Sequence, residues 1–450
     1  MIMQKKILLW FDVEDYATIE SDGAFAELLT MLDETGVRAT IKFCAKKLDL
    51  LRQRGRTDIL SRLASHELSF HTTLHSVHPL PTEYLDCYGF RTGAEEFARR
   101  EEAGFRLVGE ITGQHLTSYG QPGESWAPQV FPVLRKWGVP TYLDAHSILG
   151  VNGQPFWYGG ILCYTDLVNL IRLQHQDGGL EQYIRDFENI STDCKDTVFI
   201  STYDHPTEFS STVFWDEVNF LNGKNPQLLQ PAPLRAPGEQ TKYIEMLRQF
   251  LLYTQKQPDV EYLTASQGLA LEQQRHTPIT GAEVKAIAGE LGSQISFSPV
   301  GGAYLAASEI FSLAAKYLTG RMLVPELLYG PEAEEESAVI DSTVSARELA
   351  EAALRQFDQV MGYKQLRSLY RVGRNLLNPA DLLSTMLEAV RTGKDEVSVC
   401  QGTLAAVRYV REPKAEDGWT QWILWKKDFY PETIYRHTRL QTWTLKPAVF

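Results

Sequence analysis

Two histidines four residues apart are the feature of this sequence with the clearest chemical potential. His71 and His75 lie in the stretch His-Glu-Leu-Ser-Phe-His-Thr-Thr-Leu-His, residues 66–75. A helix that begins at about residue 71 would place both imidazoles on one face, because a helix turns once in 3.6 residues. Two imidazoles on one face can bind a single metal ion. With a third protein ligand and one open position, such a site is typical of catalysis rather than of structural support.

An acidic cluster near the start of the chain offers the third ligand. Asp12, Glu14 and Asp15 stand at the end of an apolar run at residues 7–11. Alternate residues of an extended strand share a face, so we expect Asp12 and Glu14 to point together and Asp15 to point away. The chain can also turn here, and Asp15 is kept as the alternative carboxylate to Glu14. The expected ion is divalent, and Zn²⁺ is favoured because it accepts imidazole and carboxylate ligands.

The elements that must position these side chains alternate along residues 1–275. Amphipathic stretches such as residues 25–35, closed by Gly36, predict helices. Short apolar runs between them predict buried strands at residues 7–11, 39–44, 67–70, 115–119, 141–144 and 197–203. This alternation predicts an α/β fold with a mostly parallel sheet, open or closed into a barrel. Active sites of such folds collect at the carboxyl ends of the strands.

Composition limits the classes of partner. The chain has 450 residues, 44% of them hydrophobic, and a net charge of −13, which argues against a nucleic-acid partner. No apolar run approaches the ~20 residues of a membrane span, and the first run is too short for a signal peptide. The five cysteines are scattered and show no CxxC spacing, as in reduced intracellular proteins. We therefore expect a soluble cytoplasmic protein, and a homo-oligomer is left open.

The last part of the chain, residues 276–450, differs in kind. It is expected to be smaller and mostly helical, and it follows a polar linker at residues 272–278. Residues 300–312 align without gaps onto residues 372–384, which predicts two repeat units at about 279–330 and 345–395. A short β-containing tail is expected after them, with a strand pair near residues 405–410 and 419–425. These repeats faintly resemble pseudomurein-binding repeats.

Residues 7–270 resemble the polysaccharide deacetylases of the NodB homology type, carbohydrate esterase family 4. Five segments match the family motifs in order: Phe-Asp-Val-Glu-Asp-Tyr at 11–16 (an Asp-Val-Glu variant), Ala-Thr-Ile-Lys-Phe at 39–43, the double-histidine stretch at 66–75, Thr-Gly-Gln to Gln-Pro-Gly at 112–123, and Tyr-Asp-His-Pro at 203–206. The resemblance implies a distorted (β/α) barrel over residues 1–275. It also implies a metal-dependent hydrolase that removes N-acetyl groups from an amino-sugar glycan or glycan precursor.

The same resemblance implies roles for individual residues. Asp12 is the expected general base and His205 the expected general acid, and Asp144 could orient His205. The segment Gln121, Pro122 and Gly123 is expected to offer backbone N–H groups to the oxyanion, since glycine permits a close approach. Two further residues keep two alternatives each. Trp126 either stacks on a sugar ring or packs in the core, and His66 either lies just behind the substrate or has a structural role.

Two other functions stay open at this point. The family arginine that pairs with the catalytic base is replaced by Gly120, so Asp12 is expected to lack that cation. This departure resembles an atypical branch that includes allantoinase-like enzymes, which suggests an amidohydrolase of a small metabolite. It also allows a catalytically inactive module that binds glycans.

Overall fold

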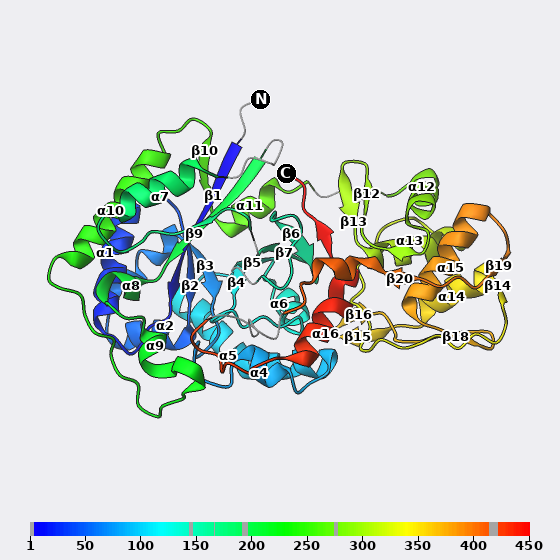
Figure 1. The fold of residues 1–450 in the computed structure, drawn as a ribbon, viewed down its shortest axis with the longest axis horizontal. Helices are drawn as coiled ribbons and strands as arrows, with labels where there is room; N and C mark the ends of the chain where they lie inside the picture. Colours follow the sequence, from blue (N-terminus) through cyan, green and yellow to red (C-terminus); the bar gives the residue numbers. More distant parts are fainter. Residues whose placement is uncertain (1–3, 144–146, 166, 191–196, 274–277, 414–421) are drawn as a thin grey trace.

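The computed structural model describes residues 4–143, 147–165, 167–190, 197–273, 278–413 and 422–450. Figure 1 shows a large part built around a sheet and a smaller, mostly helical part at its side. The red end of the chain runs back to the large part, so the last residues lie against the sheet rather than at the far end of the molecule.

The large part contains one 11-stranded sheet. Its strand order is β21-β6-β7-β5-β4-β3-β2-β1-β9-β8, and β10 also pairs with β1. The pairings from β7 through β5 and β1 to β8 are parallel, as is the pairing of β10 with β1. Strand β6 is antiparallel to both of its neighbours, β7 and β21. The strands are β1 (Gln4–Val13), β2 (Thr40–Phe43), β3 (Glu67–Phe70), β4 (Ser118–Gly120), β5 (Thr141–Leu143), β6 (Phe156–Tyr158), β7 (Ile161–Tyr164), β8 (Leu170–Ile171), β9 (Thr197–Asp204), β10 (Val260–Leu263) and β21 (Lys446–Pro447).

The expected mostly parallel α/β sheet is confirmed, but among the described residues no pairing joins β21 to β8. The sheet is therefore curled and open rather than closed into a barrel. Strand β1 is buried from Ile7 to Val13, as expected for a strand with structure on both faces. Gly36 ends α1 with a positive φ of 69°, which confirms the expected C-cap.

Helices of the large part pack against the sheet. In chain order they are α1 (Glu20–Thr35), α2 (Ala45–Gln53), α3 (Thr57–Leu60), α4 (Pro81–Leu85), α5 (Phe90–Thr112), α6 (Val130–Lys136), α7 (Gly179–Glu188), α8 (Pro206–Ser210), α9 (Trp215–Phe220), α10 (Glu239–Thr254) and α11 (Ala265–Leu271). Among the described helices, here and in the second part, none is long and apolar enough to cross a membrane.

The second part has its own hydrophobic core, which includes Ile310, Phe311, Leu383 and Met386. Its helices are α12 (Gly281–Leu291), α13 (Ala307–Leu318), α14 (Ala346–Arg355) and α15 (Pro379–Thr392). Short strands join them: β11 (Gln294–Ile295), β12 (Ser298–Val300), β13 (Ala303–Leu305), β14 (Thr343–Ser345), β15 (Asp358–Val360), β16 (Tyr363–Gln365), β17 (Tyr370–Val372), β18 (Asn375–Leu377), β19 (Glu396–Ser398) and β20 (Thr403–Leu404).

The two segments that align in sequence adopt the same local structure. Each forms an antiparallel hairpin, β12–β13 or β17–β18, followed at once by a helix, α13 or α15. The duplication and its resemblance to pseudomurein-binding repeats stay predictions.

The tail does not form the expected strand pair. Residues Ala405–Tyr409 form a 3-10 helix, and the described end of the other segment, 422–425, is not a strand. After it, α16 (Glu432–Leu440) packs on the large part: the indole N–H of Trp126 and the hydroxyl of Tyr158 donate to Thr438 oxygens, each at 3.0 Å.

Candidate metal centre and acid–base site

The sequence places four of the predicted site residues at neighbouring strand ends. Asp12 and Glu14 stand at the end of β1, His71 directly follows β3, and His205 directly follows β9. Strands β3, β2, β1 and β9 are consecutive in the sheet and parallel. Their carboxyl ends therefore meet at one edge, and the side chains converge there.

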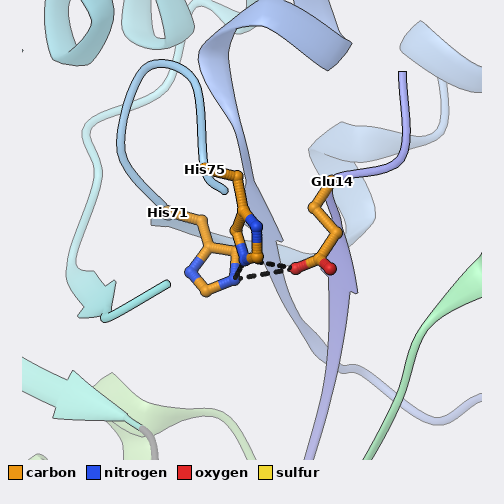
Figure 2. Close-up of side chains that lie close together, drawn as sticks. All are labelled: Glu14, His71 and His75. Atoms are coloured by element: carbon orange, nitrogen blue, oxygen red, sulfur yellow. Dashed lines mark hydrogen bonds and ion pairs between the residues drawn. The ribbon is translucent and has the colours of Figure 1, made fainter. Parts of the chain in front are cut away.

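Glu14, His71 and His75 point toward one another from two directions, as Figure 2 shows. The Nε2 atom of His71 lies 3.1 Å from Oε2 of Glu14 and 3.0 Å from Nε2 of His75. The Nε2 atom of His75 lies 2.6 Å from the same Oε2 atom. All three residues are buried, with exposed fractions of 1–4%. The ligand atoms of the predicted histidine pair and of the carboxylate thus converge on one point.

These three atoms fit a divalent ion. Bonds of 2.0–2.1 Å in tetrahedral geometry place ligand atoms roughly 3.3 Å apart, so outward shifts of a few tenths of an ångström suffice. The imidazole N–H of His71 at Nδ1 donates to the carbonyl oxygen of Gly120 at 2.7 Å, which leaves a lone pair on Nε2. Burial, followed by the nearby Lys42, lowers the pKa of His71, which favours the neutral, ligating form.

Glu14 rather than Asp15 is the carboxylate at this point. Trp215 donates its indole N–H to Oε1 of Glu14 at 2.9 Å, which turns Oε2 toward the imidazoles. Burial opposes ionisation of Glu14, but His75, His205 and His71 outweigh it and hold its pKa well below the usual range. Asp15 instead accepts backbone N–H bonds from Ala17 and Thr18, each at 2.9 Å, at the entry to α1.

The expected helix at residue 71 is wrong. Residues 71–80 form a loop, and Thr72 and His75 have positive φ angles of 62° and 52°. The backbone N–H groups of Ala45 and Lys46 donate to the carbonyl oxygens of Thr72 and Thr73, each at 3.0 Å. The N-terminus of α2 therefore holds the loop, and the two imidazoles converge through its tight turns rather than through helical periodicity.

A buried carboxylate also holds this loop. Oε2 of Glu101, on α5, accepts from both the backbone N–H and the hydroxyl of Thr73, each at 2.7 Å. Gly104, one turn along the same helix, leaves room for Thr73, because a Cβ there would overlap the Thr73 hydroxyl. The loop that carries the two histidines is therefore fixed at its centre.

Asp12 lies between the triad and His205. Its Oδ2 atom is 3.8 Å from Nε2 of His71, 3.6 Å from Nε2 of His205 and 2.9 Å from Nζ of Lys42. The expectation that Asp12 lacks a cationic partner is therefore wrong, since Lys42 supplies one from the neighbouring strand. Among the described residues, Oδ1 of Asp12 has no hydrogen-bond partner. Asp12, Glu14 and His205 form a second group whose ligand atoms lie within 4.8 Å of one another.

His205 is oriented by a residue that the sequence reasoning missed. Its Nδ1–H donates to Oε2 of Glu208 at 2.7 Å, and Arg172 pairs with the same carboxylate at 2.6 Å. Burial disfavours the imidazolium, but Glu208, Glu14 and Asp12 outweigh it and raise the pKa of His205 to about 9. The sequence did contain a signal for Glu208, because an acidic residue three positions after a helix N-cap is a capping-box pattern. Asp144, the residue expected to orient His205, lies outside the described residues.

The segment from Gln121 to Gly123, expected near the substrate, is held by contacts with aromatic side chains. Oε1 of Gln121 accepts from the Tyr142 hydroxyl at 2.7 Å, and Pro122 beside it is buried. Gly123 has a positive φ of 48°, and its carbonyl oxygen accepts from the indole of Trp425 at 2.8 Å. An oxyanion role for the N–H groups of this segment stays a prediction.

Trp126 and His66 both take the structural alternative. Trp126 is fully buried against Phe131, Tyr142 and Tyr158, so it cannot stack on a sugar ring. His66 stands at the opposite end of β3 from His71, where its Nδ1 accepts from the backbone N–H of Ala39 at 3.3 Å. Burial lowers the pKa of His66 to about 4, so it is a neutral core histidine.

Comparisons with known proteins give weak similarities. No family model matches the chain, and the search of curated proteins returned no match. Carbohydrate-active enzymes are among its structural neighbours. The 4-alpha-glucanotransferase of Thermococcus litoralis matches with a TM-score of 0.40 at 11% identity, over 60% of this chain and 41% of that one. The match to a mutant of BA3943, a CE4 family pseudoenzyme, has a TM-score of 0.34 at 12% identity, over 58% and 66% of the chains.

A family 4 carbohydrate esterase from Streptomyces lividans, solved in complex with acetate, also matches. Its TM-score is 0.32 at 12% identity, over 57% of this chain and 90% of that one. The matched region spans less than two thirds of the glucanotransferase and of the BA3943 mutant. Similarities at this level assign neither a family nor an activity, so the function of this chain has to be inferred from its own residues.

Proposed function

We propose that this protein is a metal-dependent amide hydrolase that removes N-acetyl groups from an amino sugar. The observation that carries the proposal is the convergence of Glu14, His71 and His75 on one point, with Oδ2 of Asp12 only 3.8 Å from His71. A divalent ion held by that triad would polarise the acetamide carbonyl and lower the pKa of a water molecule beside it. The motif resemblance of residues 7–270 supports the acetamide as the bond that is cleaved.

The chain's own residues supply the proton transfers. Asp12 accepts a proton from the attacking water through Oδ1, the oxygen that has no hydrogen bond among the described residues. His205, protonated because its pKa is about 9, donates the proton at Nε2 to the departing amine nitrogen. The carbonyl carbon gains a bond to the water oxygen and the C–N bond breaks, so the products are acetate and a free amine. Glu208 keeps Nδ1 of His205 engaged, so that only Nε2 faces the reacting atoms.

The test is acetate release from N-acetylglucosamine and its oligomers by the zinc-loaded protein. We expect activity that chelator abolishes and zinc restores. Replacing Asp12 by Asn should lower kcat by about 10²–10⁴-fold, the range for loss of a general base, with zinc content unchanged. Full activity in chelator, or an Asp12→Asn variant as active as the wild type, would contradict the proposal.

The burial of the site favours a second candidate, an amidase of a small metabolite. Asp12, Glu14, His71, His75 and His205 are each 7% exposed or less. Residues of the tail pack close to the site: the ring centroid of Phe214 lies 4.8 Å from that of His205, and the ring centroid of Trp422 lies 5.5 Å from that of Phe214. A polymer needs an open groove, whereas a small amide fits a closed site. Activity on a soluble cyclic or linear amide, without activity on any N-acetylated sugar, would select this candidate.

A further inference from the structure

A buried lysine stands beside the proposed general base. Lys42 on β2 is the register partner of Asp12 on β1, so the two side chains leave neighbouring parallel strands side by side. Its ammonium lies 2.9 Å from Oδ2 of Asp12, and the exposed fractions of the two side chains are 0% and 4%. An ammonium group is rarely taken fully out of water unless a specific partner compensates for the lost hydration.

The surroundings of Lys42 are built to keep the ammonium at this point. A Cβ on Gly120 of β4 would overlap Cδ of Lys42 and lie 2.7 Å from its Nζ. The φ angle of Gly120 is not in the left-handed region, so the backbone does not demand glycine there. Glycine at position 120 is instead explained by the space that the lysine side chain occupies.

An aromatic ring contributes on another side. Nζ of Lys42 lies 5.7 Å from the ring centroid of Trp10, and Trp10 is itself stacked on Tyr203 at 5.1 Å. A cation near an aromatic face gains electrostatic attraction without a charged partner. The indole therefore helps to hold the ammonium without competing with Asp12 for its charge.

We propose that Lys42 is the positioning residue for Asp12. Its ammonium engages Oδ2, and this leaves Oδ1 as the oxygen that accepts the proton of the attacking water. Lys42 forms no bond to substrate and transfers no proton. The inference rests on the proposed function for its catalytic consequence, but the placement of the carboxylate is a separate structural claim.

The test compares zinc-loaded, full-length variants at position 42 with a matched control. Lys42→Met should lower kcat by about 100-fold while KM and zinc content stay near the wild-type values, since only the base is misplaced. Lys42→Arg should recover part of this loss, because it restores a cationic donor. Lys47→Met is the control: Lys47 is also a buried ammonium, but it is bonded to Asp22 at 2.6 Å. It should lower thermal stability without the same loss of kcat.

A second variant covers the case in which Lys42→Met does not fold. Gly120→Ala keeps the ammonium but pushes it away from Asp12, so it should produce the same fall in kcat. Wild-type kcat in both Lys42→Met and Gly120→Ala, or an equal loss in Lys47→Met, would overturn the proposal. If the wild-type chain cleaves no N-acetyl substrate, the proposed function fails by itself. A crystal structure of Lys42→Met then decides the positioning claim: a rotated Asp12 carboxylate supports it, and an unmoved one refutes it.

Discussion

At the scale of single residues, the candidate site follows from side-chain type and strand-end position. Asp12, His71 and His205 could be predicted because polar residues that follow buried strands gather at one edge of a parallel sheet. Strand alternation also favoured Glu14 over Asp15, and Glu14 is the carboxylate that lies beside the two histidines. The Lys42–Asp12 contact could not be predicted, because it depends on strand register.

Glu208 sets the protonation of His205, which gives a prediction for the pH profile. A general acid must carry its proton, so wild-type activity should fall as the pH rises through about 9, the raised pKa of His205. Glu208→Gln removes the largest favourable charge, so His205 should lose its proton at lower pH. The alkaline limb of the kcat/KM profile should therefore move down by about one pH unit or more.

The matched control is Glu217→Gln, because Glu217 lies on the neighbouring α9 and is exposed. Its profile should coincide with that of the wild type. An alkaline limb that does not move in Glu208→Gln would show that Glu208 does not set the pKa of the acid.

At the scale of elements, the conformation of the loop after β3 could not be predicted from the sequence. The spacing of His71 and His75 suits a helix, but spacing alone does not exclude a loop that brings the same rings together. The bonds that decide the loop come from α2 and from Glu101, which are distant in sequence. Local periodicity carries no information about such contacts.

Removal of Glu101 should therefore weaken metal binding without touching a ligand. Glu101→Ala breaks both bonds to Thr73 and frees the loop that carries the histidines. We expect zinc affinity to fall by about 10–100-fold, the usual effect of removing a group that orients metal ligands. Competition with a chromophoric chelator measures it.

The neighbouring Glu102→Ala is the matched control, because the Glu102 carboxylate pairs with the exposed Arg106 four residues along the same helix rather than with the loop. Equal zinc affinity in Glu101→Ala, Glu102→Ala and the wild type would show that the loop holds its shape without Glu101.

At the scale of the whole molecule, the last residues join the large part to the second part of the chain. The division at residues 275 and 276 stays a prediction, but the described residues 422–450 pack on the sheet side. Leu424 is fully buried, and a Cβ on Gly123 would overlap it. Strand β21 pairs with β6 at the edge of the sheet. Nothing in the second part indicated a function: its core is apolar, and among the described residues none of the groups that could hold a metal ion lies in it.

Truncation of the Leu424 side chain tests whether the packing of the last residues stabilises the large part. Leu424→Ala should lower the free energy of unfolding by about 2–5 kcal/mol, since a fully buried leucine leaves a cavity when it is shortened. Leu228→Ala should change it little, because Leu228 is 76% exposed. Urea unfolding followed by tryptophan fluorescence measures both. An equal free energy of unfolding in the two variants would mean that the packing of the tail does not stabilise the large part.

The central claim is that Glu14, His71 and His75 hold one divalent ion between them, and anomalous diffraction at the zinc edge tests it most directly. Crystals of the zinc-loaded protein should show a single strong peak about 2.0–2.2 Å from Nε2 of both histidines and from a carboxylate oxygen of Glu14, the normal zinc bond lengths. The peak should vanish in His75→Ala. A peak elsewhere in the molecule, or none between these three side chains, would contradict the account.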